Sequence, residues 1–170
     1  MTPLVRRTWA RCGQTPVLEQ RTRHHQKVSV IAAVVVSPAG RYVRLYFRLH
    51  SEAGIRTPAL VGFLHQLHRQ IRRPFLVLWD RLKTHRSAKA YDFLARRGGS
   101  PPFFLPTYAP ELNPVEIVWS YLKTNRLANF APLDFPTLLA ATRRHTRSIQ
   151  HSPLLLRSFV AHSPLFIGHA

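Results

Sequence analysis

A hairpin signal near the start of the chain constrains the fold more than any other feature. Residues 27–37 are an almost unbroken run of valine, isoleucine and alanine, which is typical of a strand buried on both faces. Ser-Pro-Ala-Gly at 37–40 predicts a turn. Residues 41–50 then alternate, with Tyr46 and Arg48 on the side expected to face solvent. We therefore predict an antiparallel β-hairpin.

Strand and helix signals alternate after the hairpin. Helical spacing of apolar residues predicts helices at 57–73, 86–97, 113–127, 135–149 and 153–161, and short apolar runs predict strands at 74–79 and 103–105. This order implies an α/β fold, a mixed sheet flanked by helices. The expected organisation is a basic loop region at 1–26, a core at 27–127 and C-terminal helices at 128–170.

The charge of the chain narrows its partners. The 170 residues include 25 Lys and Arg against 7 Asp and Glu, a net charge of +18, and such a field attracts nucleic acid. The single cysteine, Cys12, excludes a disulfide framework and a cysteine-rich zinc site, and it fits a reducing compartment. No apolar run approaches the roughly 18 residues that a membrane helix needs, so no membrane partner is expected. The charge indicates nucleic acid as the class of partner, but the biochemical activity has to be inferred from individual residues.

Two of the seven acids lie beside apolar segments. Asp80 follows a predicted strand, at the end where open sheets hold their ligands, and Glu116 lies in the first turn of a predicted helix. Paired carboxylates suit Mg²⁺, and two such ions support phosphodiester cleavage. Structural roles compete with this interpretation. Glu116 stands three residues after Asn113 and completes a capping box, and Asp80 suits a turn.

Several other residues admit both functional and structural interpretations. His85 is placed either to reach back to Asp80 or a DNA phosphate, or simply to start a helix. His65 and His68 have helical spacing for a metal, but no second ligand pair accompanies them, which favours solvated or stacked histidines. The three tryptophans are expected in the core or at its edge, because their neighbours are apolar: Trp9, Trp79 and Trp119.

A long segment resembles a known family. Residues 105–116 read LPTYAPELNPVE and are followed by Trp119, Leu122 and Lys123, which is similar to the LPxYxPxLNPxExxWxxLK stretch of mariner-related DDE transposases of bacterial insertion sequences. RTWA at 7–10, GQTP at 13–16 and VLWD at 77–80 with His85 follow the family's order. The resemblance spans residues 3–126.

The resemblance implies a fold, an activity and a site. Residues 27–127 would be part of a ribonuclease-H-like catalytic core, and the activity would be DNA transposition, by metal-dependent hydrolysis and strand transfer. Asp80 and Glu116 would be the second and last acids that bind Mg²⁺ or Mn²⁺. The residues expected to contact phosphates of transposon ends and target DNA are Arg81, Lys83, His85, Arg86, Lys89 and Lys123. A bacterial cytoplasmic, nucleoid-associated protein is implied, acting as a homodimer or with an intact transposase.

The sequence departs from the family in one respect. The family's first acid ends the first core strand, just before the Arg-Thr-Trp segment, and no acid precedes Glu19 here. The first core strand is therefore expected to be missing, and the chain to be a truncated or mis-started copy with little cleavage of its own. The alternatives are a catalytically inactive, basic nucleic-acid-binding remnant and a fragment that pairs with an intact transposase through its sheet edge.

Overall fold

The computed structural model describes residues 6–17, 27–51, 54–96 and 101–166. Parts of the predicted basic region, at 1–5 and 18–26, lie outside the described residues, as does the end of the helix predicted at 86–97. None of the described helices has the length and apolar character needed to cross a membrane.

The predicted hairpin is confirmed. Strands β1 (Ser29–Val36) and β2 (Val43–His50) pair antiparallel, from Ser29 opposite His50 to Val36 opposite Val43. In the turn, Ser37 Oγ accepts a hydrogen bond from the Tyr42 N–H at 3.1 Å. Gly40 adopts a φ of 65°, a left-handed conformation that glycine tolerates without steric cost. The turn sequence thus sets the register of the two strands.

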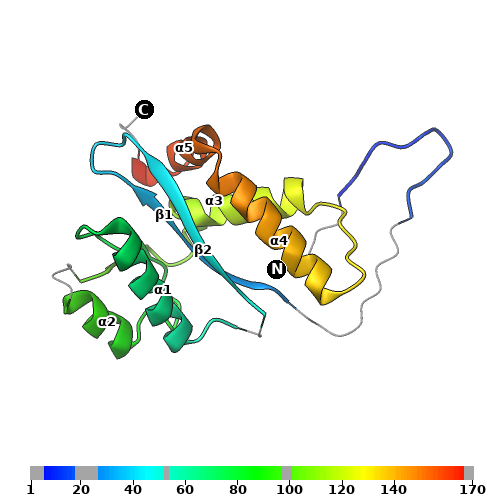
Figure 1. The fold of residues 1–170 in the computed structure, drawn as a ribbon. Coiled ribbons are helices and arrows are strands. Elements are labelled where there is room, and N and C mark those ends of the chain that lie inside the picture. The colour runs from blue at the N-terminus through cyan, green and yellow to red at the C-terminus, as the bar shows by residue number, and fades with distance from the viewer. Residues whose placement is uncertain (1–5, 18–26, 52–53, 97–100, 167–170) are drawn as a thin grey trace.

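Both faces of the hairpin are covered, which differs from the sequence prediction. One hydrophobic cluster joins Val43 and Leu45 to helices α3 (Pro114–Tyr121), α4 (Phe135–Gln150) and α5 (Pro153–Ala161). A second cluster joins Ile31 to α1 (Thr57–Ile71) and α2 (Ala88–Ala95), with Tyr46 packed against it. Figure 1 shows the hairpin between these two groups of helices. On the side expected to face solvent, Tyr42 and Arg44 are exposed as predicted, whereas Tyr46 and Arg48 are half-buried.

Two short strands form the rest of the described sheet structure. Strands β3 (Leu78–Trp79) and β4 (Phe103–Phe104) pair parallel, and they form a sheet separate from the hairpin. A parallel pair beside an antiparallel pair agrees with the predicted mixed arrangement. Within the described residues, no strand joins β1 to β3.

This separation explains two differences from the predicted burial. Of the β1 residues only Ile31 is buried and the others are half-buried, whereas the sequence predicts burial on both faces. Leu78 is 51 % exposed, although residues 74–79 were expected to form a buried strand. A strand paired on one edge has no neighbouring strand on the other, and it therefore lacks the cross-strand side chains that would cover its own on each face.

Helix α3 continues into a π-helical turn, η2 (Leu122–Arg126), where the Leu127 N–H donates to the Leu122 carbonyl. The predicted helix over 113–127 therefore ends in a wider coil.

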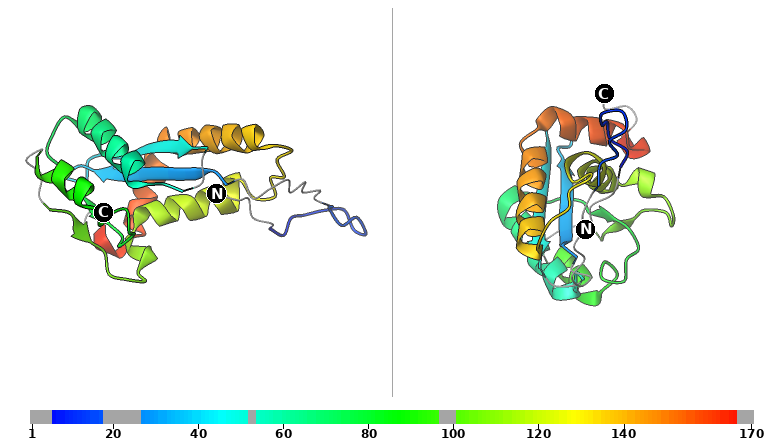
Figure 2. Two further views of the ribbon diagram at one scale, coloured as in Figure 1. Left: turned by 90° about the horizontal axis from the view of Figure 1, so that it is seen from below. Right: turned by 90° about the vertical axis from the view of Figure 1, so that its right-hand side faces the viewer.

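Segment 6–17 contains no helix or strand and extends away from the remaining structure (Figure 2). The Arg6 N–H and guanidinium donate to Asn129 Oδ1 and to the Thr124 carbonyl. Trp9 is 99 % exposed, so its predicted place in the core is wrong, because no described element covers this segment.

Helix α4 begins with a side-chain cap that titrates. Asp134 Oδ1 accepts a hydrogen bond from the Thr137 N–H at 2.8 Å. Hydrogen bonds from the side chain and backbone of Thr137 lower the pKa of Asp134 below its ordinary value of 3.8. Because the folded pKa is depressed, the cap stabilises the fold above pH 3.8, and this contribution is lost as the pH falls through the folded pKa.

We therefore expect Asp134→Ala to lower the melting temperature at pH 7, and the difference from the unmodified chain to shrink as the pH falls below 3.8. Circular dichroism melts across this pH range measure the effect. Asp92→Ala removes an exposed acid within α2 and is the control. An Asp134→Ala difference that is constant with pH would contradict the role of the charged cap.

Candidate catalytic site

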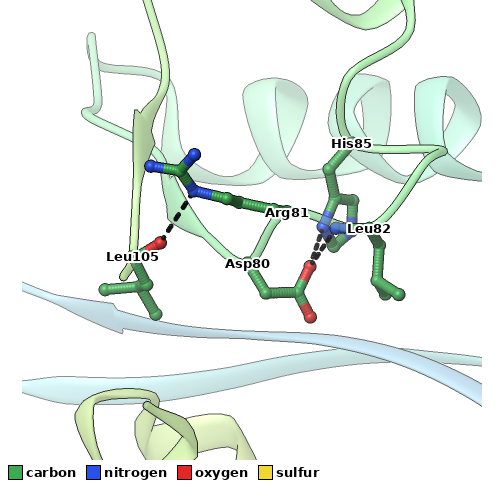
Figure 3. A network of polar contacts seen from close by, with 5 residues as sticks. All are labelled: Asp80, Arg81, Leu82, His85 and Leu105. Atoms are coloured by element: carbon green, nitrogen blue, oxygen red, sulfur yellow. Dashed lines mark hydrogen bonds and ion pairs between the residues drawn. The ribbon is translucent and has the colours of Figure 1, made fainter. Parts of the chain in front are cut away.

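Asp80 lies directly after β3, at the carboxyl end of the parallel pair. Its Oδ1 accepts a hydrogen bond from the Leu82 N–H at 3.0 Å and lies 2.6 Å from His85 Nδ1 (Figure 3). The contact with Leu82 is an Asx turn. The prediction that Asp80 is a turn residue is therefore correct for its Oδ1 atom. Oδ2 has no hydrogen bond in the described structure. Asp80 thus keeps one carboxylate oxygen available to a ligand.

His85 is held from two sides. The turn at 82–85 returns the chain toward Asp80, through a hydrogen bond from the His85 N–H to the Leu82 carbonyl. The imidazole stacks on the Trp79 ring, with centroids 4.8 Å apart and planes 2° from parallel. Of the two interpretations of His85, the one in which it reaches Asp80 is confirmed. Its orientation leaves Asp80 with one fixed and one free oxygen.

Trp79 was predicted as a core residue, and it is buried. Its ring also supports His85, which was not predicted from the sequence. The only available signal was that Trp79 directly precedes Asp80, with His85 following after a short turn. Burial patterns do not reveal ring stacking, because stacking depends on how the turn closes.

Glu116 lies in the first turn of α3 and is exposed. Asn113 caps this helix as predicted, accepting from the Val115 N–H at 3.1 Å. The second half of the predicted capping box is absent from the described contacts. The Asn113 N–H donates to the Pro110 carbonyl at 3.0 Å instead, in the preceding turn. The capping-box interpretation of Glu116 is therefore wrong, and its carboxylate has no hydrogen-bond partner among the described residues.

The structure does not join Asp80 to Glu116 by any described contact. Helix α3 packs against β1 and belongs to the first cluster, whereas Trp79 belongs to the second. Among the residues that the structure describes, no three His, Cys, Asp or Glu side chains lie close enough to hold a metal together. The free oxygens of Asp80 and Glu116 nevertheless suit Mg²⁺ or Mn²⁺, since Mg²⁺ keeps several waters and takes one or two carboxylates.

The predicted phosphate-contacting residues differ in their surroundings. Arg81 Nε donates to the Leu105 carbonyl at 3.4 Å, which fixes the side chain beside β4 (Figure 3). Lys83, Arg86 and Lys89 are exposed, and Lys123 is half-buried within η2. The side chains of the three lysines and of Arg86 have no polar partner among the described contacts. They are available to an external anion.

His65, one of the two histidines with helical spacing for a metal, makes a packing contact. His65 packs its ring on Phe93, with centroids 4.4 Å apart. This contact agrees with the ordinary structural interpretation.

Residues 2–138 match the family model described as DDE superfamily endonuclease. None of the curated proteins matches the chain.

Solved structures of transposases resemble the fold. A Mos1 transposase paired-end complex with left transposon end is 15 % identical, with a TM-score of 0.61 over 96 % of this chain and 48 % of that chain. The Mos1 strand transfer complex is 18 % identical, with a TM-score of 0.52 and coverages of 96 % and 52 %. A Mos1 mariner paired-end complex with Mn is 17 % identical, with a TM-score of 0.51 and the same coverages. The chain spans about half the length of these relatives, and the predicted ribonuclease-H-like fold is confirmed.

Proposed function

This chain belongs to the DDE superfamily endonuclease family, and from that membership we propose that it acts in DNA transposition. The reaction would hydrolyse a phosphodiester bond at the end of a mobile element and then transfer the new 3′-hydroxyl to target DNA. The match of the family model over residues 2–138 is the observation that carries this proposal. The likeness to Mos1 transposase, solved with a transposon end, supports it.

In this proposal Asp80 and Glu116 hold a divalent cation, Mg²⁺ or Mn²⁺. Such an ion, when bound, activates the attacking oxygen and stabilises the leaving oxygen. His85 fixes Oδ1 of Asp80, and the stacked Trp79 ring restricts the imidazole. The free Oδ2 of Asp80 and the unpaired carboxylate of Glu116 supply hard oxygen donors.

The cationic side chains around Asp80 would bind the DNA backbone. Arg81, anchored on Leu105, presents its remaining guanidinium nitrogens, and the exposed Lys83, Arg86 and Lys89 extend the same segment. Phosphate contacts of this kind position a duplex without reading its sequence. Lys123 and His85 complete the proposed set. The partners would be transposon-end and target DNA in the bacterial cytoplasm, with a second copy or an intact transposase.

One observation favours a second candidate, a protein that binds nucleic acid without cutting it. Among the described residues no three potential ligands gather into a metal site, and no contact joins Asp80 to Glu116. In-line displacement depends on accurate positioning of the metal ligands, so a chain without a third ligand would keep the charge-driven binding of DNA and lose the catalysis.

Plasmid nicking separates the two candidates. Under the first we expect the 170-residue chain to nick supercoiled plasmid only with Mn²⁺ or Mg²⁺, and slowly, because the family's first acid is missing. Asp80→Asn and Glu116→Gln should abolish this nicking. Asp92→Asn, an exposed acid on α2, should leave the rate unchanged. Plasmid that is shifted on a gel but stays intact would support the second candidate. A chain that neither shifts nor nicks plasmid would contradict both.

A further inference from the structure

A pocket at the carboxyl end of α1 lies outside the site described above. Its volume is about 370 Å³, and its lining consists of His68, Arg69, Arg72, Arg73 and Pro74. The pocket lies at the start of the segment leading into β3, and Asp80 lies at the end of that segment. Since six residues extend over at most about 20 Å, Pro74 at the pocket lies within that distance of Asp80, which is less than about one helical turn of DNA.

The chemistry of the pocket is cationic. Three of its five lining residues are arginines and one is a histidine, and the three arginines are exposed to solvent. Among the described residues, none of these side chains forms an ion pair or hydrogen bond. Guanidinium groups offer a planar set of donors that matches phosphate oxygens, so an unpaired group of them is suited to a phosphate.

The dipole of helix α1 explains the position of only two of the four basic residues. His68 and Arg69 lie in the last turn of α1, where cations stabilise the negative end of a helix. Arg72 and Arg73 lie beyond the last helical residue, Ile71. The Arg72 N–H donates to the His68 carbonyl at 3.1 Å, and this bond at the end of the helix uses the backbone of Arg72 and not its side chain.

Arg72 also occupies a conformation that its side chain disfavours. Its φ is 55° and its ψ is 22°, the left-handed region in which helices usually end with glycine. Any residue with a Cβ is strained there relative to glycine. No described contact of the Arg72 side chain offsets this strain. A strained residue with an unused guanidinium group points to a role in binding.

We propose that this pocket binds a backbone phosphate of duplex DNA, at a distance from the catalytic carboxylates. The inference rests on the proposed function, because DNA is the partner that supplies the phosphate. The pocket would hold the duplex beside the site around Asp80 and carry no sequence preference, as phosphate contacts do.

Arg72→Gly tests the proposal, because it should change stability and binding in opposite directions. The melting temperature should stay equal or rise, since glycine relieves the strain. The affinity for a duplex of about two helical turns, measured by fluorescence anisotropy in EDTA, should fall about fivefold at 0.1 M salt. The slope of log affinity against log salt should decrease by about one between roughly 50 and 200 mM.

Arg69→Ala and Arg147→Ala form a matched pair, because both arginines are exposed in the last turn of a helix. Arg69→Ala should reduce affinity and salt slope as Arg72→Gly does, and Arg147→Ala should change the affinity less than about twofold. Equal losses from both alanine variants would overturn the proposal, since they would reflect net charge alone. Unchanged DNA affinity in Arg72→Gly, or a lower melting temperature, would also overturn it.

Inorganic phosphate is the alternative ligand, because it carries the same oxygen acceptors as a DNA phosphate. If inorganic phosphate raised the melting temperature of the unmodified chain but not of Arg72→Gly, while DNA affinity stayed equal, the site would hold free phosphate and the proposal for DNA would fail. Because these measurements contain no divalent metal, absence of nicking leaves them unaffected. Failure of the pocket and failure of the nuclease are therefore distinguishable.

Discussion

Replacing Asp80 with asparagine is expected to lower the affinity of the chain for Mn²⁺ by at least about tenfold, the smallest effect usual for changes around a metal site. Asparagine has the same shape, and its side-chain oxygen can still accept from the Leu82 N–H and from His85. The substitution therefore removes the negative charge while the turn at 82–85 stays in place. A loss of affinity would follow from the missing carboxylate and not from a rearranged loop.

Electron paramagnetic resonance of free Mn²⁺ during a titration measures this affinity directly, without requiring DNA or turnover. Asp92→Asn is the control, because Asp92 is exposed on α2 and lies away from β3 in sequence. Circular dichroism should give the same melting temperature for both variants. If Asp80→Asn and Asp92→Asn bound Mn²⁺ equally well, the assignment of Asp80 as a ligand would be wrong.

The second large effect concerns three consecutive leucines at the start of α5. Leu156 is 1 % exposed and belongs to the cluster around Val43 and Leu45, whereas Leu154 is 81 % exposed. Leu156→Ala should lower the free energy of unfolding by about 3 kcal/mol, from lost burial and the cavity left behind. Leu154→Ala should change it by less than about 0.5 kcal/mol.

Urea unfolding followed by tryptophan fluorescence measures both values, since Trp79 and Trp119 are at least half-buried. The two variants remove the same atoms from the same helix, so helix propensity cancels between them. For a chain of this size, the Leu156→Ala loss corresponds to a melting temperature about 6 to 12 °C lower. Equal effects of the two substitutions would contradict the orientation of α5.

Features that depend on neighbouring residues could be predicted from the sequence. The hairpin register follows from its turn, and α1 follows from the spacing of Leu60, Phe63, Leu64 and Leu67, which are all buried. Asn113 caps α3 as predicted. In each case the interaction lies within a few residues along the chain, so the local pattern contains the information.

Burial was predicted less well, because it depends on which element covers which face. The composition of β1 suggested a strand enclosed on both faces, but β1 pairs only with β2 among the described residues. Tyr46 alternates like a solvated residue, yet it packs against the cluster that α1 forms. Trp9 has an apolar side chain, and its segment extends into solvent. Side-chain chemistry alone does not say where a packing partner will be.

Some features of the candidate site also follow from the sequence, and others depend on tertiary packing. The sequence by itself determined the family resemblance and the basic charge, and it left the contact of His85 with Asp80 as one of several possibilities, which the structure then confirmed. Only the tertiary structure decided that His85 stacks on Trp79, that Glu116 forms no capping box, and that basic side chains at the end of α1 line a pocket. Ring stacking, competing backbone partners and pocket shape arise when separate elements pack, and this packing is not encoded in any local pattern.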